Sequence, residues 1–477
     1  MIPRINVKTL NGGLGRTLDT SKVIAMAGVS STGSYLPQMM NRVADVIATY
    51  GAGPLVEDAC FAIKAFGIPV LCCRVESTGD GTVTAVERVG SGAVITVSAS
   101  PTPNGAYEPH VEFIMGGTRG TPGITYKTSL DGGRTQSATT ALGTAVVIDF
   151  PASAGTIQFA IAAGDLAAGE TAMVTTTAPA WAAADLTTAI EALAAHSVQW
   201  DFLQIAGVLT DDDVGAIELV KADMFNRGRD IRWMGGCPLP ARGDTEAEYL
   251  ADMVEEFVTH SDYGSICFGQ CRLTSAVDSG KYHRSPVTVV GPLSQYVSEE
   301  QDIAQITLGP LLTCSITDEN GNPEDHDEER SPGADDAGFL TLRTHANEPG
   351  VYVNNPRIFS AAGSDFKYTH TRRVVNLGLK EARRYLKRRL SSAIRVSSTT
   401  GFIVESDASE IEKGGTAVLG NVLKPKPKAS DATMVVGRAD NILSTEEFTV
   451  DISIVPLAYP KAINVQIGLV NPALVTV

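Results

Sequence analysis

Apolar and polar positions follow three different patterns along this 477-residue chain. In residues 23–86, and again from residue 182 to 268, apolar runs alternate with stretches of helical periodicity. Residues 68–75 (IPVLCCRV) form a continuous apolar run, which is typical of a strand covered on both faces. Residues 200–208 (WDFLQIAGV) also indicate a buried strand. This rhythm predicts a mostly parallel sheet with helices packed on it.

Helices are expected between these strands. They cover residues 36–50, 55–66, 185–196, 210–228 and 245–260. Three consecutive carboxylates, Asp211 to Asp213, follow Thr210, and a helix start explains them better than a metal site does. Thr245 with Glu248 three residues later forms a capping box.

Residues 87–175 have a different pattern, rich in Thr, Ser, Gly and Ala. Short alternating segments such as 93–97 (AVITV) and 156–160 (TIQFA) are separated by turn signals at 103–105 (PNG) and 131–133 (DGG). This pattern predicts a small all-β, sandwich-like domain inserted into the α/β domain.

The last third begins with an acidic, loop-like stretch, residues 317–336, whose carboxylates lack the spacing of a calcium loop and indicate a solvated linker. A helix is expected over residues 373–394, and alternating strands over 448–454 and 463–469. The apolar stripe of that helix is Val375, Leu379, Ala382, Leu386, Leu390 and Ala393. Its opposite faces carry Lys380, Arg383, Arg384, Lys387, Arg388 and Arg389.

The predicted fold class is therefore α/β (α+β) and multidomain, with an αβ core, an inserted all-β domain and extended terminal strands. The expected parts are an N-terminal arm (1–22), the core (23–86 plus 176–316), the inserted domain (87–175), the acidic linker (317–336), a C-terminal domain (337–460) and a C-terminal arm (461–477).

Charge narrows the possible functions. The chain has 38 Lys and Arg against 54 Asp and Glu, a net charge of −16, so a main role in binding nucleic acid is disfavoured.

No apolar run approaches the roughly 20 residues that span a bilayer, and we expect no membrane insertion. The start, MIPRINVKTLNGG, has no apolar signal-peptide core, which favours folding in the cytoplasm.

The seven cysteines are scattered and odd in number, which favours reduced thiols packed as small hydrophobes. Cross-linking between subunits in oxidising surroundings is the alternative. Cys72 and Cys73 lie in an apolar strand, so the better candidates for such disulfides are Cys237, Cys267, Cys271 and Cys314.

The sequence contains no convincing active site. Its seven His residues are dispersed, and it has no Walker sequence, nucleophile elbow or zincin motif. The stretch 11–15 (NGGLG) resembles part of a phosphate loop but lacks an apolar strand before it. We therefore expect no catalytic residue, no cofactor and no bound metal.

Several segments together resemble the tail sheath proteins of contractile bacteriophages and related injection systems. Residues 50–59 (YGAGPLVEDA), followed by a strand that ends in Arg74-Val75, are similar to the N-terminal region of sheath proteins. Residues 351–357 (VYVNNPR), 363–366 (GSDF) and 372–375 (RRVV) are similar to the C-terminal sheath domain, in which a strand precedes a long Arg-rich helix.

The resemblance implies a non-enzymatic structural protomer of a virion tail that is assembled in the cytoplasm of the host bacterium. Such subunits stack as hexameric rings around an inner tube, meet a baseplate and a tail terminator, and contract to drive the tube through the host envelope. It also implies that Lys380, Arg383, Arg384, Lys387 and Arg388 face the tube.

By the same resemblance, the terminal segments add strands to neighbouring subunits. Ile5 and Val7 alternate with polar residues at one end, and Ile463, Val465, Ile467 and Leu469 do so at the other. The alternatives are that both strands close their own domain, and that the basic helix is a solvated face or pairs with residues 317–336.

Two other functions stay open at this point: a baseplate or receptor-binding protein that uses the β domain for adhesion, and a nucleotide-dependent α/β enzyme. Self-assembly into long tubes would distinguish a sheath from an adhesin, which should stop at a closed oligomer.

Overall fold

The computed structural model describes residues 22–98, 101–241, 243–317, 323–324 and 332–465. The chain divides into two compact units, Met1–Arg372 and Arg373–Val477, and the division falls within one helix. Each unit is described below by itself.

The first unit is built on a six-stranded sheet in the order β18-β17-β16-β1-β3-β2. All neighbours are parallel except β2, which is antiparallel to β3 at one edge. The strands are β1 (Ile24–Gly28), β2 (Gln38–Met40), β3 (Val70–Arg74), β16 (Phe202–Val208), β17 (Arg232–Gly236) and β18 (Gly264–Cys267). The α/β core predicted from the apolar runs is confirmed.

Helices cover both faces of this sheet because successive strand residues point to opposite sides. Ile24 and Met26 join one apolar cluster, and Ala25 and Ala27 join the other. The first cluster is covered by α1 (Val43–Tyr50), α2 (Pro54–Phe61, continued by a π-helical turn to Phe66) and α6 (Val287–Tyr296). The second is covered by α3 (Ala183–Ala195), α4 (Asp211–Asn226) and α5 (Glu246–Glu256).

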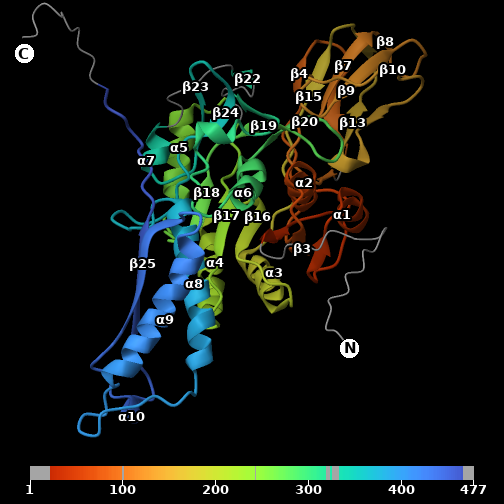
Figure 1. Ribbon diagram of the computed structural model, residues 1–477. Coiled ribbons are helices and arrows are strands. Elements are labelled where there is room, and N and C mark those ends of the chain that lie inside the picture. The colour runs from red at the N-terminus through yellow and green to blue at the C-terminus, as the bar shows by residue number, and fades with distance from the viewer. Residues whose placement is uncertain (1–21, 99–100, 242, 318–322, 325–331, 466–477) are drawn as a thin grey trace, which may run out of the picture. The chain divides into compact units, whose positions relative to one another are not determined.

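Between β3 and α3 the chain forms an all-β region, drawn in orange to gold in Figure 1, where β7, β9 and β13 are among its labelled strands. A five-stranded sheet has the order β10-β9-β7-β15-β4, and a three-stranded sheet has the order β11-β13-β5. Their strands are β4 (Glu87–Val89), β5 (Ile95–Val97), β7 (His110–Met115), β9 (Thr125–Ser129), β10 (Thr140–Ala141), β11 (Val147–Asp149), β13 (Gln158–Ile161) and β15 (Thr171–Met173). Two short pairs complete it: β6 (Thr102–Pro103) with β12 (Gly155–Thr156), and β8 (Gly117–Thr118) with β14 (Asp165–Leu166). The region encloses an apolar cluster that includes Phe113 and Phe159, and we call residues 87–175 the inserted domain.

A second small sheet in this unit has the order β20-β19-β21-β22. Its strands are β19 (Cys271–Thr274), β20 (Lys281–Arg284), β21 (Cys314–Thr317) and β22 (Pro323–Glu324). The expectation of a solvated linker over residues 317–336 therefore needs correction. Thr317 pairs with Pro323, and Asp335 in the short helix α7 (Pro332–Asp336) is buried and accepts from Arg357 Nη2 at 2.8 Å.

The expected C-terminal domain boundary at residue 337 also needs correction. The hairpin of β23 (Leu342–His345) and β24 (Glu348–Val353) contributes Leu342, Val351 and Val353 to the apolar cluster beneath α1, α2 and α6. These side chains are buried against the core, so the hairpin belongs to the first unit, and the second unit begins only at Arg373.

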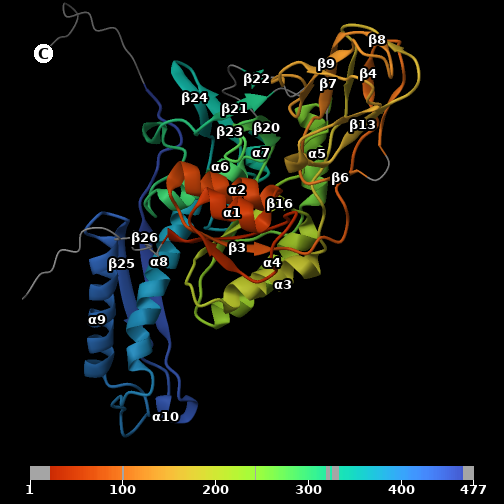
Figure 2. The same cartoon turned by 90° about the vertical axis from the view of Figure 1, so that its right-hand side faces the viewer.

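The second unit pairs two helices with a two-stranded sheet, as Figure 2 shows for α8, α9, β25 and β26. Its elements are α8 (Thr369–Leu386, continued by a 3-10 turn Lys387–Arg389), α9 (Glu405–Leu423), β25 (Ala429–Val436), α10 (Ile442–Thr445) and β26 (Val450–Pro456). Leu419 and Leu423 of α9 and Met434 of β25 lie in an apolar cluster of this unit, to which α8 contributes Val374 and Ala382.

Candidate assembly surfaces

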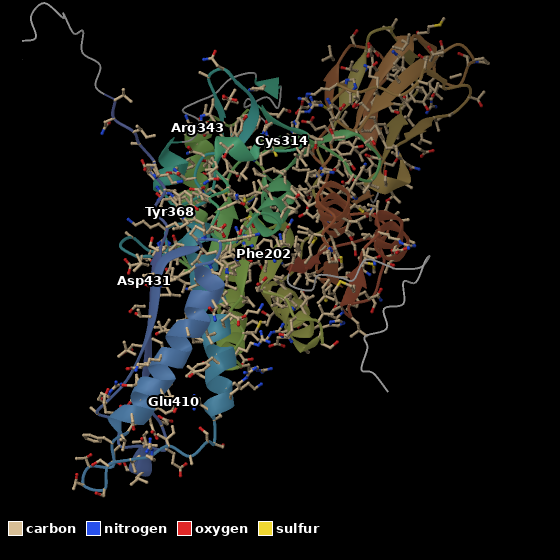
Figure 3. All side chains as sticks on the ribbon, viewed as in Figure 1. Phe202, Cys314, Arg343, Tyr368, Glu410 and Asp431 are labelled. Atoms are coloured by element: carbon tan, nitrogen blue, oxygen red, sulfur yellow. The ribbon has the colours of Figure 1, made fainter. Side chains whose placement is uncertain are left out.

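The exposed basic residues of α8 form the first candidate surface. Lys380, Arg384, Lys387 and Arg388 are exposed and Arg383 is half-buried. The side chain of Arg384 is 73% exposed and lies 3.8 Å from the Glu381 carboxylate, an exposed pair of little energetic weight. Arg389, at the end of the series, pairs with Glu410 of α9 at 3.0 Å; Figure 3 labels Glu410. The four exposed residues leave most of their charge facing solvent.

Charge is distributed unevenly between the two units. Residues 373–477 carry 14 Lys and Arg against 10 Asp and Glu, although the whole chain has 38 against 54. The second unit is therefore basic while the rest of the chain is strongly acidic. A basic surface on an acidic subunit favours an acidic partner for that surface alone.

The buried stripe of α8 differs from the one expected. Val374 and Ala382 are buried, with Leu377 and Tyr385 half-buried against the same apolar cluster, whereas Leu390 is 74% exposed. A Cβ at Gly378 would lie 2.4 Å from Ile454 Cδ1, so the helix packs on β26 most closely at this glycine. The helix ends before residue 390 because Ser391 has φ 59°, a left-handed conformation that terminates the helical turn.

The second candidate surface is the sheet of β25 and β26, whose two outer edges differ. On β25, the outward N–H groups of Met434 and Val436 donate to Thr416 Oγ1 (3.1 Å) and Glu412 Oε1 (2.8 Å) of α9. On β26, the outer edge pairs with no strand in the described part of the chain. The edge of β25 is therefore occupied by side chains at two of its N–H groups, whereas the edge of β26 has no paired strand in the described residues.

The expected strand arms lie mostly beyond the described residues. Ile5, Val7, Ile467 and Leu469 are outside them. Ile463 and Val465 are described; they belong to no strand and are 78% and 74% exposed. The described residues of the expected strand at 463–469 therefore form no strand, and neither of these two side chains is buried against the second unit.

The proposal that cysteines cross-link subunits needs correction for three of the four candidates. Cys237, Cys267 and Cys271 are at most 1% exposed, because each lies in or beside a core strand. Burial also raises the pKa of the Cys237 and Cys267 thiols well above the usual range, which removes the reactive thiolate. Cys314, labelled in Figure 3, is half-buried, and its cross-linking stays a prediction.

Sequence reasoning missed a pair of buried carboxyl groups on α2. Asp58 accepts hydrogen bonds from Thr288 Oγ1 at 2.7 Å and from Gln204 Nε2 at 2.8 Å. Glu57 accepts from Ser275 Oγ at 2.8 Å and lies 3.8 Å from the Arg284 guanidinium. Burial raises the pKa of Asp58 to about 6, and it raises the pKa of Glu57 too. Both residues belong to the YGAGPLVEDA segment, but their partners are more than 140 positions away.

This burial predicts that Asp58→Asn changes the pH dependence of stability. A raised pKa in the folded state contributes stability at low pH that is lost as pH rises through the folded value. On lowering the pH from about 7.5 to about 5, the wild type should gain about 1.4 kcal/mol of unfolding free energy relative to D58N. Gln204 Oε1 has no partner, so a rotated amide would bond the new Asn and keep D58N folded.

Urea unfolding of both proteins across that pH range measures the difference. Asp252→Asn removes a charge from an exposed position on α5 and serves as the matched control. Its free energy of unfolding should follow that of the wild type across this pH range. Parallel pH profiles for wild type and D58N would contradict the assignment.

The acidic residues that could suggest a metal site instead cap helices in the described part of the chain. Thr210 and Asp213 form a capping box at the start of α4, and Thr245 and Glu248 form one at the start of α5, as expected. In the described residues, no group of three or more His, Cys, Asp or Glu is arranged to hold a metal ion. None of the described helices is long and apolar enough to cross a bilayer. The NGGLG stretch lies outside the described residues.

A search of curated protein sequences found no significant match. Among solved structures, the sheath of an extracellular contractile injection system, the PVC sheath complex in its contracted state, matches with a TM-score of 0.51 and 9% identity, covering 98% of this chain and 97% of that one. The sheath tail protein of Listeria innocua matches at TM-score 0.46 and 13% identity (92% and 95% covered), and that of Desulfitobacterium hafniense at 0.45 and 14% (94% and 100% covered).

The family model described as "DUF2586, N-terminal domain" matches residues 2–357, about three quarters of the sequence. The chain therefore belongs to the DUF2586 family, and its fold is that of a contractile sheath protein.

Proposed function

We propose that this chain is the protomer of a contractile sheath, in a phage tail or a related injection system. The observation that carries the proposal is the likeness to the PVC sheath, which extends over nearly the whole length of both chains. Copies would stack as hexameric rings around an inner tube, between a baseplate and a tail terminator. Contraction would then drive the tube through the host envelope.

Strand addition to the open edge of β26 would link the copies. The edge of β26 is seven residues long, about 23 Å at 3.3 Å per residue, and a terminal segment of similar length would cover it. Backbone hydrogen bonds of this kind are independent of side-chain packing between domains. They would hold neighbouring subunits together while the domains rotate, which a shortening sheath requires.

The basic surface of α8 would contact an acidic inner tube. Each exposed ion pair contributes about 0–1 kcal/mol and is screened by salt. Several such contacts would align a sheath on its tube and still release it during contraction. Energy for shortening would come from repacking between subunits, without a bound nucleotide.

Electron microscopy of the purified protein alone tests this function. We expect long, regular tubes, because a sheath protomer carries both the strand and the edge that receives it. A closed oligomer of fixed size would contradict the sheath role and favour a baseplate or receptor-binding protein.

A further inference from the structure

The inserted domain is joined to the core covalently by two chain segments that run side by side. Isolated bridges pair Gly79 with Ala180 and Val83 with Thr176, and the hydroxyls of Thr82 and Thr177 are 2.9 Å apart. A two-stranded ribbon has little rigidity by itself. With these segments alone, the inserted domain would swing about them.

The hairpin β19–β20 of the core makes a separate attachment. Tyr282 on β20 is 6% exposed and belongs to the apolar cluster of the inserted domain. Its ring meets Tyr107 edge to face, with the centroids 5.0 Å apart and the planes at 87°. The hairpin therefore contributes an aromatic side chain to a cluster whose other buried members all lie within residues 87–175.

A buried ion pair lies beside this aromatic contact. Arg272 Nη2 on β19 is 3.2 Å from Asp131 Oδ2, and the two side chains are 8% and 2% exposed. The loop at 129–135 holds Asp131 in place, because Ser129 Oγ donates to Asp131 Oδ1 at 2.5 Å and the Thr135 N–H donates to the same atom at 2.7 Å. The DGG turn of the sequence thus presents a carboxylate to an arginine of the core.

Arg284 on β20 connects the inserted domain to α2. Its Nη1 donates to the Ala106 carbonyl at 2.5 Å, and its guanidinium lies 4.9 Å from the ring centroid of Tyr107 and 5.0 Å from that of Tyr282. Its other terminal nitrogen is 3.8 Å from Glu57 Oε1. Arg284 therefore contacts the insertion and a buried carboxylate of the core with opposite ends of one planar group.

We propose that Arg272, Arg284 and Tyr282 form a joint that locks the inserted domain to the core, so that the two move as one rigid body. The proposal rests on the sheath function for its purpose: a domain carried rigidly keeps its outer surface in register when subunits rearrange. All the contacts of the joint lie within one protomer. The ion pair matters most, because each buried charge requires its partner.

Distance measurement between two spin labels tests the joint. Labels are attached to cysteines introduced at Thr139 in the inserted domain and Asp252 on α5, both exposed, in a Cys314→Ser background in which the remaining native cysteines are buried. The labelled full chain is diluted with unlabelled protein, so that only distances within one protomer are recorded. We expect a single narrow distance distribution for this reference protein.

Arg272→Gln and Asp131→Asn each break this buried ion pair and should abolish the narrow peak. Arg119→Gln is the matched control, because Arg119 donates to the Ile161 carbonyl within the inserted domain and takes no part in the joint; its peak should stay narrow. If R272Q does not fold, D131N and Arg284→Lys decide the question. Narrow distributions in the folded joint variants would overturn the proposal.

This result is independent of the sheath function. A chain that forms no tubes would still give the narrow reference distance if the joint exists. A chain that forms tubes but shows a broad reference distance would refute the joint alone.

Discussion

A protein that lacks residues 461–477 is expected to remain folded and to form no tubes. Ile463 and Val465 are exposed, so their removal costs the described fold little packing. The open edge of β26 would then lack the strand that we propose it receives from another copy. Tube formation by electron microscopy, with circular dichroism to verify folding, measures the result. Removing residues 1–15 should have the same effect if that segment is also a linking strand.

Point variants sharpen this prediction. Changing Ile463, Val465, Ile467 and Leu469 to Ser removes one face of the alternating segment, where each buried side chain contributes about 1.5–3 kcal/mol. Changing Asn464 and Gln466 to Ser alters the other face and is the matched control. Tubes should be lost in the first variant and kept in the second. Tubes of normal length after truncation, or an unfolded truncated protein, would show that the segment has another role.

Reversing the charge of Arg384 and Arg388 to Glu should prevent assembly on the tube while the protomer stays folded. Both side chains are exposed, and the ion pair of Arg384 with Glu381 on the same helix is weak. Each reversal turns an attraction toward an acidic partner into a repulsion. Co-sedimentation of the sheath protein with purified inner tubes measures the effect, and the wild-type interaction should itself weaken as salt is raised.

The chain offers a control with the same change in net charge. Lys413 on α9 and Lys426 in the following loop are exposed and belong to the same unit, but neither lies on α8. K413E/K426E should bind the tube like the wild type. Equal loss of binding in both double variants would mean that overall charge, not the α8 surface, governs association. Unchanged binding in R384E/R388E would refute the tube-facing role of this helix.

Local patterns predicted the α/β core well because its strands are buried on both faces. Continuous apolar runs such as 68–75 correspond to β3, and the capping residues Thr210 and Thr245 mark the starts of α4 and α5. These signals depend on neighbouring residues only. On α8, Ala382 and Leu386 of the expected stripe do lie at the apolar cluster, but Val374 and Leu377 join it in place of Val375 and Leu379, and Leu390 is exposed.

Other features depend on contacts between distant positions, which periodicity does not reveal. Arg272 and Asp131 are 141 residues apart, and Ser275 and Glu57 are 218 apart. In the hairpin at 342–353, Leu342, Val351 and Val353 pack into the core of the first unit, a contact that local sequence does not reveal. Cys267 and Cys271 appeared accessible because they flank a strand end, although further segments pack over that end and bury them.

The closure of β25 by α9 has a consequence for the form of any assembly built through this sheet. Because Thr416 and Glu412 occupy the outward N–H groups of Met434 and Val436, strand addition as we propose it would use the edge of β26 and not that of β25. Growth by strand exchange would then be directional: every linkage has a donor and an acceptor, and the two ends of a polymer differ. The same closure limits the number of partners per sheet, which protects a strand-linked filament from branching and from indiscriminate β-aggregation.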